Sequence, residues 1–197
     1  MEKVTINKSI CLSEHITLGE VTKSSHTEIN NIPSHVAIEN LKRVCIWLEA
    51  LRARYNQRYV SSPESGEDRR GLKERLFRPP LAPPNFLRPD GSKRPEVERG
   101  GEEEPIIINS GYRSPELNKK VGGAPTSNHL TGCAVDIHVA GIEQAIRYAV
   151  ILMDYADETK QDYDELLIER SAKGNYWVHF AVRPKDNRRN TRIITTT

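Results

Sequence analysis

Residues 127–139 read SNHLTGCAVDIHV, and they contain the clearest strand pattern of the chain, around which the predicted fold is arranged. From residue 133 on, apolar side chains alternate with other types, as they do in a β-strand whose successive side chains point to opposite faces. The apolar set belongs in a core and consists of Cys133, Val135, Ile137 and Val139. Asp136 shares the opposite face with Ala134 and His138. Because an unpaired buried carboxylate is costly, we expect Asp136 to lie against a partner.

Helices and strands are predicted on both sides of this strand. The expected helices run from His35 to about Tyr55 after the cap Ser34, from Ser114–Pro115–Glu116 to Gly122–Gly123, and onward from Gly141. The further strands begin at Ile106 and cover 165–170 and 176–182. Lys173–Gly174–Asn175 suits the turn of a hairpin between the last two.

Length and composition favour one polar, water-exposed domain. A chain of 197 residues is long enough for one core and short for two. The net charge of +2 does not call for a nucleic-acid partner, although the end of the chain is locally basic. Three cysteines make no disulfide framework and show no zinc-finger spacing. We therefore expect Cys45 and Cys133 to act as small apolar core residues.

The segment 61–104 differs from the rest in composition, since it holds seven of the twelve prolines together with many charges. This composition predicts a flexible insertion, with a lid or a substrate-binding arm as the alternative. A flexible tail is expected over 186–197. The whole chain, 1–197, is then a single domain with these two additions.

The N-terminus carries charges and lacks the apolar core of a signal peptide. No apolar run approaches the about 20 residues that span a bilayer. We expect a protein without a membrane span that is cytoplasmic as synthesised.

His129, Asp136 and His179 are candidate metal ligands. His179 shares a strand face with Trp177 and Ala181, and His129 lies in the loop before the Asp136 strand. Two imidazoles and one carboxylate could hold zinc and leave a fourth position for water, as catalytic zinc sites do. The spacing alone leaves open that both histidines make ordinary hydrogen bonds.

Three ordered motifs carry a family resemblance. Residues 127–136 match S-x-H-x-x-G-x-A-x-D, residues 110–118 match S-G-Y-R-S-x-x-x-N, and residues 177–179 match W-x-H. The chain thereby resembles the zinc D-Ala-D-Ala carboxypeptidases and related murein endopeptidases. With LGEVT at 18–22 it is similar to their phage- and bacteria-associated branch. The resemblance covers roughly residues 12–58 and 105–183. It implies the α+β hedgehog/DD-peptidase fold, a small antiparallel sheet with flanking helices.

The resemblance also implies roles for single residues. His129, Asp136 and His179 match the family's zinc ligands. Arg113 matches the arginine that contacts a substrate carboxylate or carbonyl oxygen, with a structural salt bridge as the alternative. Ser127 either hydrogen-bonds substrate or serves only the turn.

The general base is a departure from the family pattern. Many relatives carry a glutamate three residues before the last histidine, where this chain has Tyr176. Tyrosine, with a pKa of about 10, is a poor base at neutral pH. Glu169 on the neighbouring strand is the expected substitute, because a hairpin that turns around Lys173–Gly174 brings residues 169 and 179 close to being cross-strand neighbours. The alternatives are that Glu169 is structural or that no dedicated base exists. His138 is either an orienting group near the ligands or a surface histidine.

The resulting expectation is a monomeric zinc peptidase that hydrolyses peptidoglycan stem peptides, at a terminal D-Ala or within a crosslink. A phage lysis enzyme and a host wall-recycling enzyme both fit, and either would act on the cell wall after release. A catalytically inactive zinc-holding module of the same fold is the alternative. A nucleic-acid or phage-structural adaptor that uses the basic end is a third hypothesis.

Overall fold

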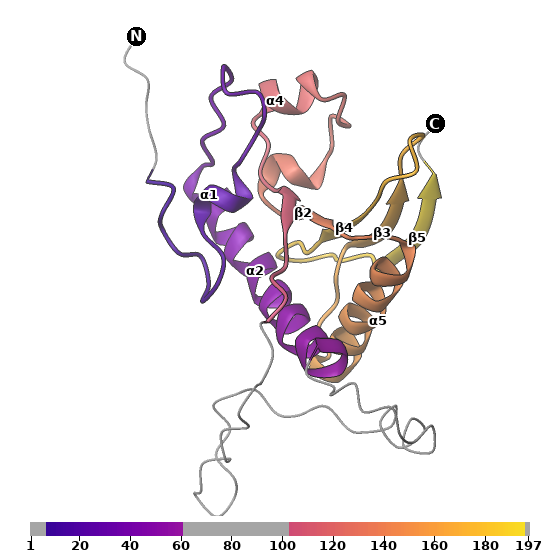
Figure 1. The fold of residues 1–197 in the computed structure, drawn as a ribbon. Helices are drawn as coiled ribbons and strands as arrows, with labels where there is room; N and C mark the ends of the chain where they lie inside the picture. Colours follow the sequence, from indigo (N-terminus) through magenta and orange to yellow (C-terminus); the bar gives the residue numbers. More distant parts are fainter. Residues whose placement is uncertain (1–6, 61–102, 196–197) are drawn as a thin grey trace, which may run out of the picture.

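The computed structural model describes residues 7–60 and 103–195 (Figure 1). Of the predicted insertion at 61–104, only residues 103 and 104 fall in this range. The prediction about that insertion therefore lies outside the described residues.

The described residues contain a five-stranded sheet in the order β1-β2-β4-β3-β5. Its strands are β1 (Ile108–Ser110), β2 (Ala134–His138), β3 (Glu165–Arg170), β4 (Tyr176–Ala181) and β5 (Asn190–Thr195). Neighbouring strands are antiparallel except β5, which runs parallel to β3. The mixed α+β architecture expected from the sequence is confirmed, with one parallel pair added to the antiparallel sheet.

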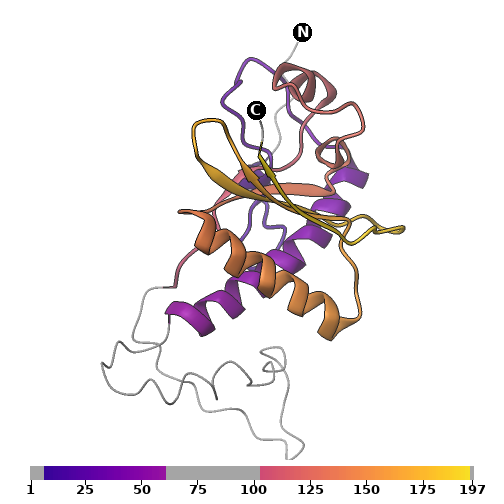
Figure 2. The ribbon, with the colours of Figure 1, turned by 90° about the vertical axis from the view of Figure 1, so that its right-hand side faces the viewer.

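The two long helices, α2 (His35–Tyr55) and α5 (Ile142–Thr159), cover one face of this sheet, as Figure 2 shows. The shorter helices are α1 (Leu18–Val21) and α4 (Pro115–Lys120), with a π-helical turn η1 (Asn56–Val60) and a 3-10 turn η2 (Asn128–Thr131). The bounds of α2 agree with the apolar spacing. Its predicted cap is confirmed, because Ser34 accepts a hydrogen bond from the backbone N–H of Ala37. Ser114 caps α4 in the same way, through Leu117.

The core lies between the sheet and the two long helices. Val135, Ile137, Val178 and Phe180 are fully buried on the helix side of β2 and β4. The indole of Trp47 on α2 packs against the ring of Phe180, with the ring centroids 5.4 Å apart. Apolar burial thus occupies one face of the sheet and leaves polar side chains such as Asp136 to the other.

Two strands differ from the sequence predictions. The first strand was expected from Ile106 but begins at Ile108, where pairing with Ile137 starts. Residues 190–195 were expected in a flexible tail over 186–197, yet they form β5 along β3. Backbone pairing places β5 there, and its mostly exposed side chains gave no apolar pattern to reveal it.

The cysteines are free: Cys45 and Cys133 are buried and Cys11 is exposed. Among the residues that the structure describes, no helix is long and apolar enough to cross a membrane.

Candidate metal centre

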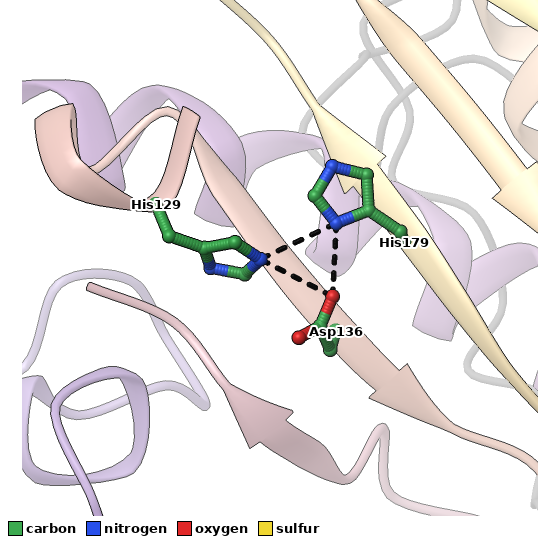
Figure 3. Close-up of side chains that lie close together, drawn as sticks. All are labelled: His129, Asp136 and His179. Atoms are coloured by element: carbon green, nitrogen blue, oxygen red, sulfur yellow. Dashed lines mark hydrogen bonds and ion pairs between the residues drawn. The ribbon is translucent and has the colours of Figure 1, made fainter. Parts of the chain in front are cut away.

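The side chains of His129, Asp136 and His179 converge on one point, as Figure 3 shows. Nε2 of His129 lies 3.2 Å from Oδ1 of Asp136, and Nδ1 of His179 lies 2.9 Å from the same oxygen. The two ring nitrogens are 3.3 Å apart. The structure thus brings together all three residues that the sequence analysis named as metal ligands.

Strand pairing positions two of these side chains. Asp136 on β2 is paired directly with His179 on β4, so both side chains lie on the face away from the long helices. His129 comes from η2, which Ser127 begins by accepting a hydrogen bond from the His129 N–H. Gly132 ends η2 at φ +72°, and a Cβ there would stand 2.4 Å from the carbonyl oxygen of Ala37. A glycine is therefore needed to turn from η2 into β2 against α2.

Hydrogen bonds behind the two imidazoles decide which nitrogen faces the centre. Nδ1 of His129 lies 2.6 Å from the carbonyl oxygen of Gly111, which can only accept, so this nitrogen carries the proton. Nε2 of His179 faces Oε2 of Glu165 at 3.5 Å and carries its proton for the same reason. In the neutral rings the opposite nitrogens then direct lone pairs at Asp136.

This donor set fits a metal cation. Three donors bound about 2.0–2.1 Å from one tetrahedral metal would stand roughly 3.3 Å apart. The observed separations of 2.9 to 3.3 Å are close to that spacing, and they are also hydrogen-bond distances. Both imidazole lone pairs point at the negative carboxylate, and this arrangement is repulsive unless a proton or a metal ion lies between the three groups. Two imidazoles and one carboxylate are ligands that zinc accepts, and a fourth position then remains for water or substrate.

Burial strengthens the electrostatics of the centre. The side chains of His129, Asp136 and His179 are 3%, 12% and 10% exposed. Burial alone would raise the pKa of Asp136, but His129 and His179 hold it well below its usual range. Burial would lower the pKa of His179, but hydrogen bonds to Asp136 and Glu165 raise it to about 9. Without a bound metal, these shifts keep the Asp136 carboxylate ionised and a proton on His179, and a bound cation would take the place of that proton.

Arg113 contacts the ligand Asp136. Its Nη2 donates to Oδ2 of Asp136 at 2.5 Å, and its Nε donates to Oγ of Ser110 at 2.9 Å. Asp136 thus offers Oδ1 to the centre and Oδ2 to the guanidinium. The salt bridge weighed as the alternative for Arg113 is present, and its partner is the candidate ligand Asp136.

Ser127 and His138 lie beside the centre in different ways. The Ser127 hydroxyl caps η2, so it serves the turn that carries His129. His138 is exposed and pairs with Trp177 across β2 and β4. It shares the face of Asp136, but it lies two pairs further along the ladder.

Glu169 lies near the centre but not directly opposite His179. Cross-strand pairing joins Leu167 to His179 and Glu169 to Trp177, so Glu169 is a diagonal neighbour. Burial raises the pKa of Glu169, and the nearby His179 opposes that rise. Tyr176 pairs with Arg170 at the end of the hairpin, and the Arg170 guanidinium lies 5.8 Å from its ring centroid.

Glu165 is a residue near the site to which the sequence analysis gave no role. It lies on the face of Leu167 and Glu169, because residues two apart on a strand share a face. Alternation therefore made Glu165 and Glu169 equal candidates for a diagonal contact with His179.

Comparison with known families confirms the resemblance seen in the motifs. Residues 97–165 match the model of the Peptidase M15 family, to which the zinc D-Ala-D-Ala carboxypeptidase-like enzymes belong. The match includes Arg113, Ser127, His129 and Asp136 and ends before the β4 residue His179. No curated protein sequence matches the chain. The family match over residues 97–165 and the convergence of His129, Asp136 and His179 together support a candidate metal site.

Proposed function

We propose that this peptidase M15 chain is a zinc-dependent hydrolase of peptidoglycan stem peptides, of the D-Ala-D-Ala carboxypeptidase or endopeptidase type. The observation that supports it most is the convergence of His129, Asp136 and His179 on one point. The order of the motifs around these residues supports the hedgehog/DD-peptidase fold. The cleaved substrate would be a peptide of the cell wall, reached after release, and the protein would act as a monomer.

Zinc held by these ligands would act as a Lewis acid that polarises the scissile carbonyl and lowers the pKa of the attacking water toward neutral pH. The remaining steps fall to side chains of the chain. Glu169 would accept the proton of the attacking water and pass it to the leaving amine. Its half-buried position and its raised pKa suit a base that must later give the proton up.

Arg113 would serve both the ligand and the substrate. A guanidinium has five N–H donors, and the contacts with Ser110 and Asp136 use two of them. A terminal carboxylate or the developing oxyanion could accept from the others. Arg113 would then fix the substrate relative to Asp136, while Ser127 holds the His129 turn in place.

The second candidate function is a zinc-holding binding module without hydrolysis. Tyr176 supports it, because many relatives carry a glutamate at this position. The module would keep His129, Asp136 and His179 but lack the base, so it would bind zinc and a peptide without cleaving it.

Digestion of purified peptidoglycan separates the two candidates. The zinc-loaded protein should release D-Ala or cut crosslinks, as mass spectrometry of the products would show. A chelator should stop the release and added zinc should restore it, while His129→Ala stays inactive in both. Zinc binding without any product would favour the binding module.

A further inference from the structure

We propose that Glu165 is a positioning residue that holds the His179 imidazole with Nδ1 toward the metal. Arg188, which Asp164 fixes, holds Glu165 in place. The proposal rests on the proposed zinc centre and deepens it. It makes the segment after β4 a part of the metal site.

The position of Glu165 on the far side of the His179 ring carries the first step. Nδ1 of His179 faces Asp136 at 2.9 Å, and Nε2 faces Oε2 of Glu165 at 3.5 Å. The ring therefore lies between two carboxylates, one at each nitrogen. A carboxylate behind a ligating histidine selects the tautomer and makes the facing nitrogen a better ligand.

Glu165 is itself held by two donors. The amide Nδ2 of Asn128 donates to Oε2 at 3.0 Å, and Nη2 of Arg188 lies 2.8 Å from Oε1. Each carboxylate oxygen thus has a partner besides the imidazole. Asn128 is also the neighbour of the ligand His129, so the same amide connects the turn of one ligand to the carboxylate behind the other.

Asp164 provides the base of this arrangement. Its carboxylate is completely buried and accepts two hydrogen bonds from the Arg188 guanidinium, Nε to Oδ1 at 2.8 Å and Nη2 to Oδ2 at 2.7 Å. Asn128 donates another at 2.8 Å, and Arg183 forms an ion pair at 3.1 Å. A buried carboxylate needs such pairing to be tolerated. Asp164 therefore fixes Arg188 and Asn128, the two groups that hold Glu165.

The simpler explanation is that this network only attaches β5 to the sheet. Asn190, the first residue of β5, does donate its backbone N–H to the carbonyl oxygen of Asp164 at 3.0 Å. Attachment alone would not require Glu165 to face His179. The two explanations differ in whether zinc affinity depends on Glu165 in a protein that stays folded.

Zinc affinity measured on the full-length protein by competition with a chromophoric chelator tests the proposal. Glu165→Gln should weaken zinc binding by about 10- to 100-fold, the usual cost of losing such a partner. Glu169→Gln is the matched control, with the same change on the same strand and face, and it should bind zinc as the wild type does. Arg188→Leu should weaken binding in the same direction as Glu165→Gln but less. The Arg188 side chain is 54% exposed but pairs with the buried Asp164, so zinc affinity is measured on the folded fraction of this variant, as determined by circular dichroism.

A second readout is the ¹⁵N spectrum of the zinc-loaded histidines. The wild type should show metal at Nδ1 and a proton at Nε2 of His179, and the reverse for His129. In Glu165→Gln the Nε2 proton signal of His179 should shift, while that of Nδ1 of His129 stays.

Wild-type zinc affinity in folded Glu165→Gln or Arg188→Leu would overturn the proposal. Equal losses in Glu165→Gln and Glu169→Gln would also overturn it, because the effect would then be one of net charge. If the wild type bound no zinc at all, the proposed function itself would fail first.

Discussion

Two glutamates on β3, Glu165 and Glu169, lie two residues on either side of Leu167, which pairs with His179. Their surroundings differ. At the first end, Glu165 is engaged by Asn128 and Arg188, and the neighbouring His179 lowers its pKa. At the other end, burial raises the pKa of Glu169. A carboxylate held by an amide and a guanidinium suits a structural role, whereas one with a raised pKa suits proton transfer. On this difference we propose positioning for Glu165 and proton transfer for Glu169.

The largest expected effect comes from removing the basicity of Glu169, which tests whether this glutamate is the general base. Glu169→Gln keeps the size of the side chain and should retain zinc, but it should lose about 10²- to 10⁴-fold in hydrolysis rate, the usual contribution of general acid–base catalysis. The measurement is the rate of peptidoglycan digestion at matched zinc occupancy. A rate near that of the wild type would take Glu169 out of the mechanism and favour hydrolysis without a dedicated base.

A second test concerns pH. The proposed base must be ionised, and burial raises the pKa of Glu169 above its ordinary value of 4.5. A carboxylate loses its basicity when it is protonated, so the rate should fall as the pH drops through the pKa that Glu169 has in the zinc-loaded protein. The profile of kcat/KM for the zinc-saturated protein should show this acidic limb. In Glu169→Gln the residual activity should lack it, and an unchanged limb would mean that another group titrates.

The smallest expected effect belongs to Tyr176. Tyr176→Phe removes only the hydroxyl at the position where many relatives carry glutamate, and it should cost less than about 10-fold in rate, since a tyrosine of pKa about 10 is a poor base at neutral pH. Digestion assays beside Glu169→Gln would show the contrast. A loss in Tyr176→Phe as large as in Glu169→Gln would point to the tyrosine hydroxyl as a catalytic group.

Local patterns predicted much of the fold. The alternation around Asp136 correctly indicated β2 and its apolar face, and the caps Ser34 and Ser114 begin the helices expected from them. These features depend on residues close together in the chain. The strand β5 could not be found in this way, because its position depends on backbone pairing with β3 and on arginines that bind Asp164 and Asp157.

The site shows the same limit. Motif order identified His129, Asp136 and His179, and the structure brings them together. The register of the hairpin could not be read as finely. A turn at Lys173–Gly174 suggested that Glu169 lies nearly opposite His179, whereas the observed pairing sets Glu169 against Trp177. This difference in register leaves Glu169 on the same face of the sheet as His179, but it makes Glu165 a diagonal neighbour of His179 as well. Only the three-dimensional contacts distinguish the two glutamates.

The central claim is that His129, Asp136 and His179 hold one zinc ion. Elemental analysis of purified wild type, His129→Ala and His179→Ala tests it most directly, with Glu169→Gln as the control that leaves all three ligands in place. The account predicts about one zinc per chain in the wild type and the control, since the site offers one set of tetrahedral donors, and a clear loss in both alanine variants. Unchanged zinc content in both alanine variants would contradict it.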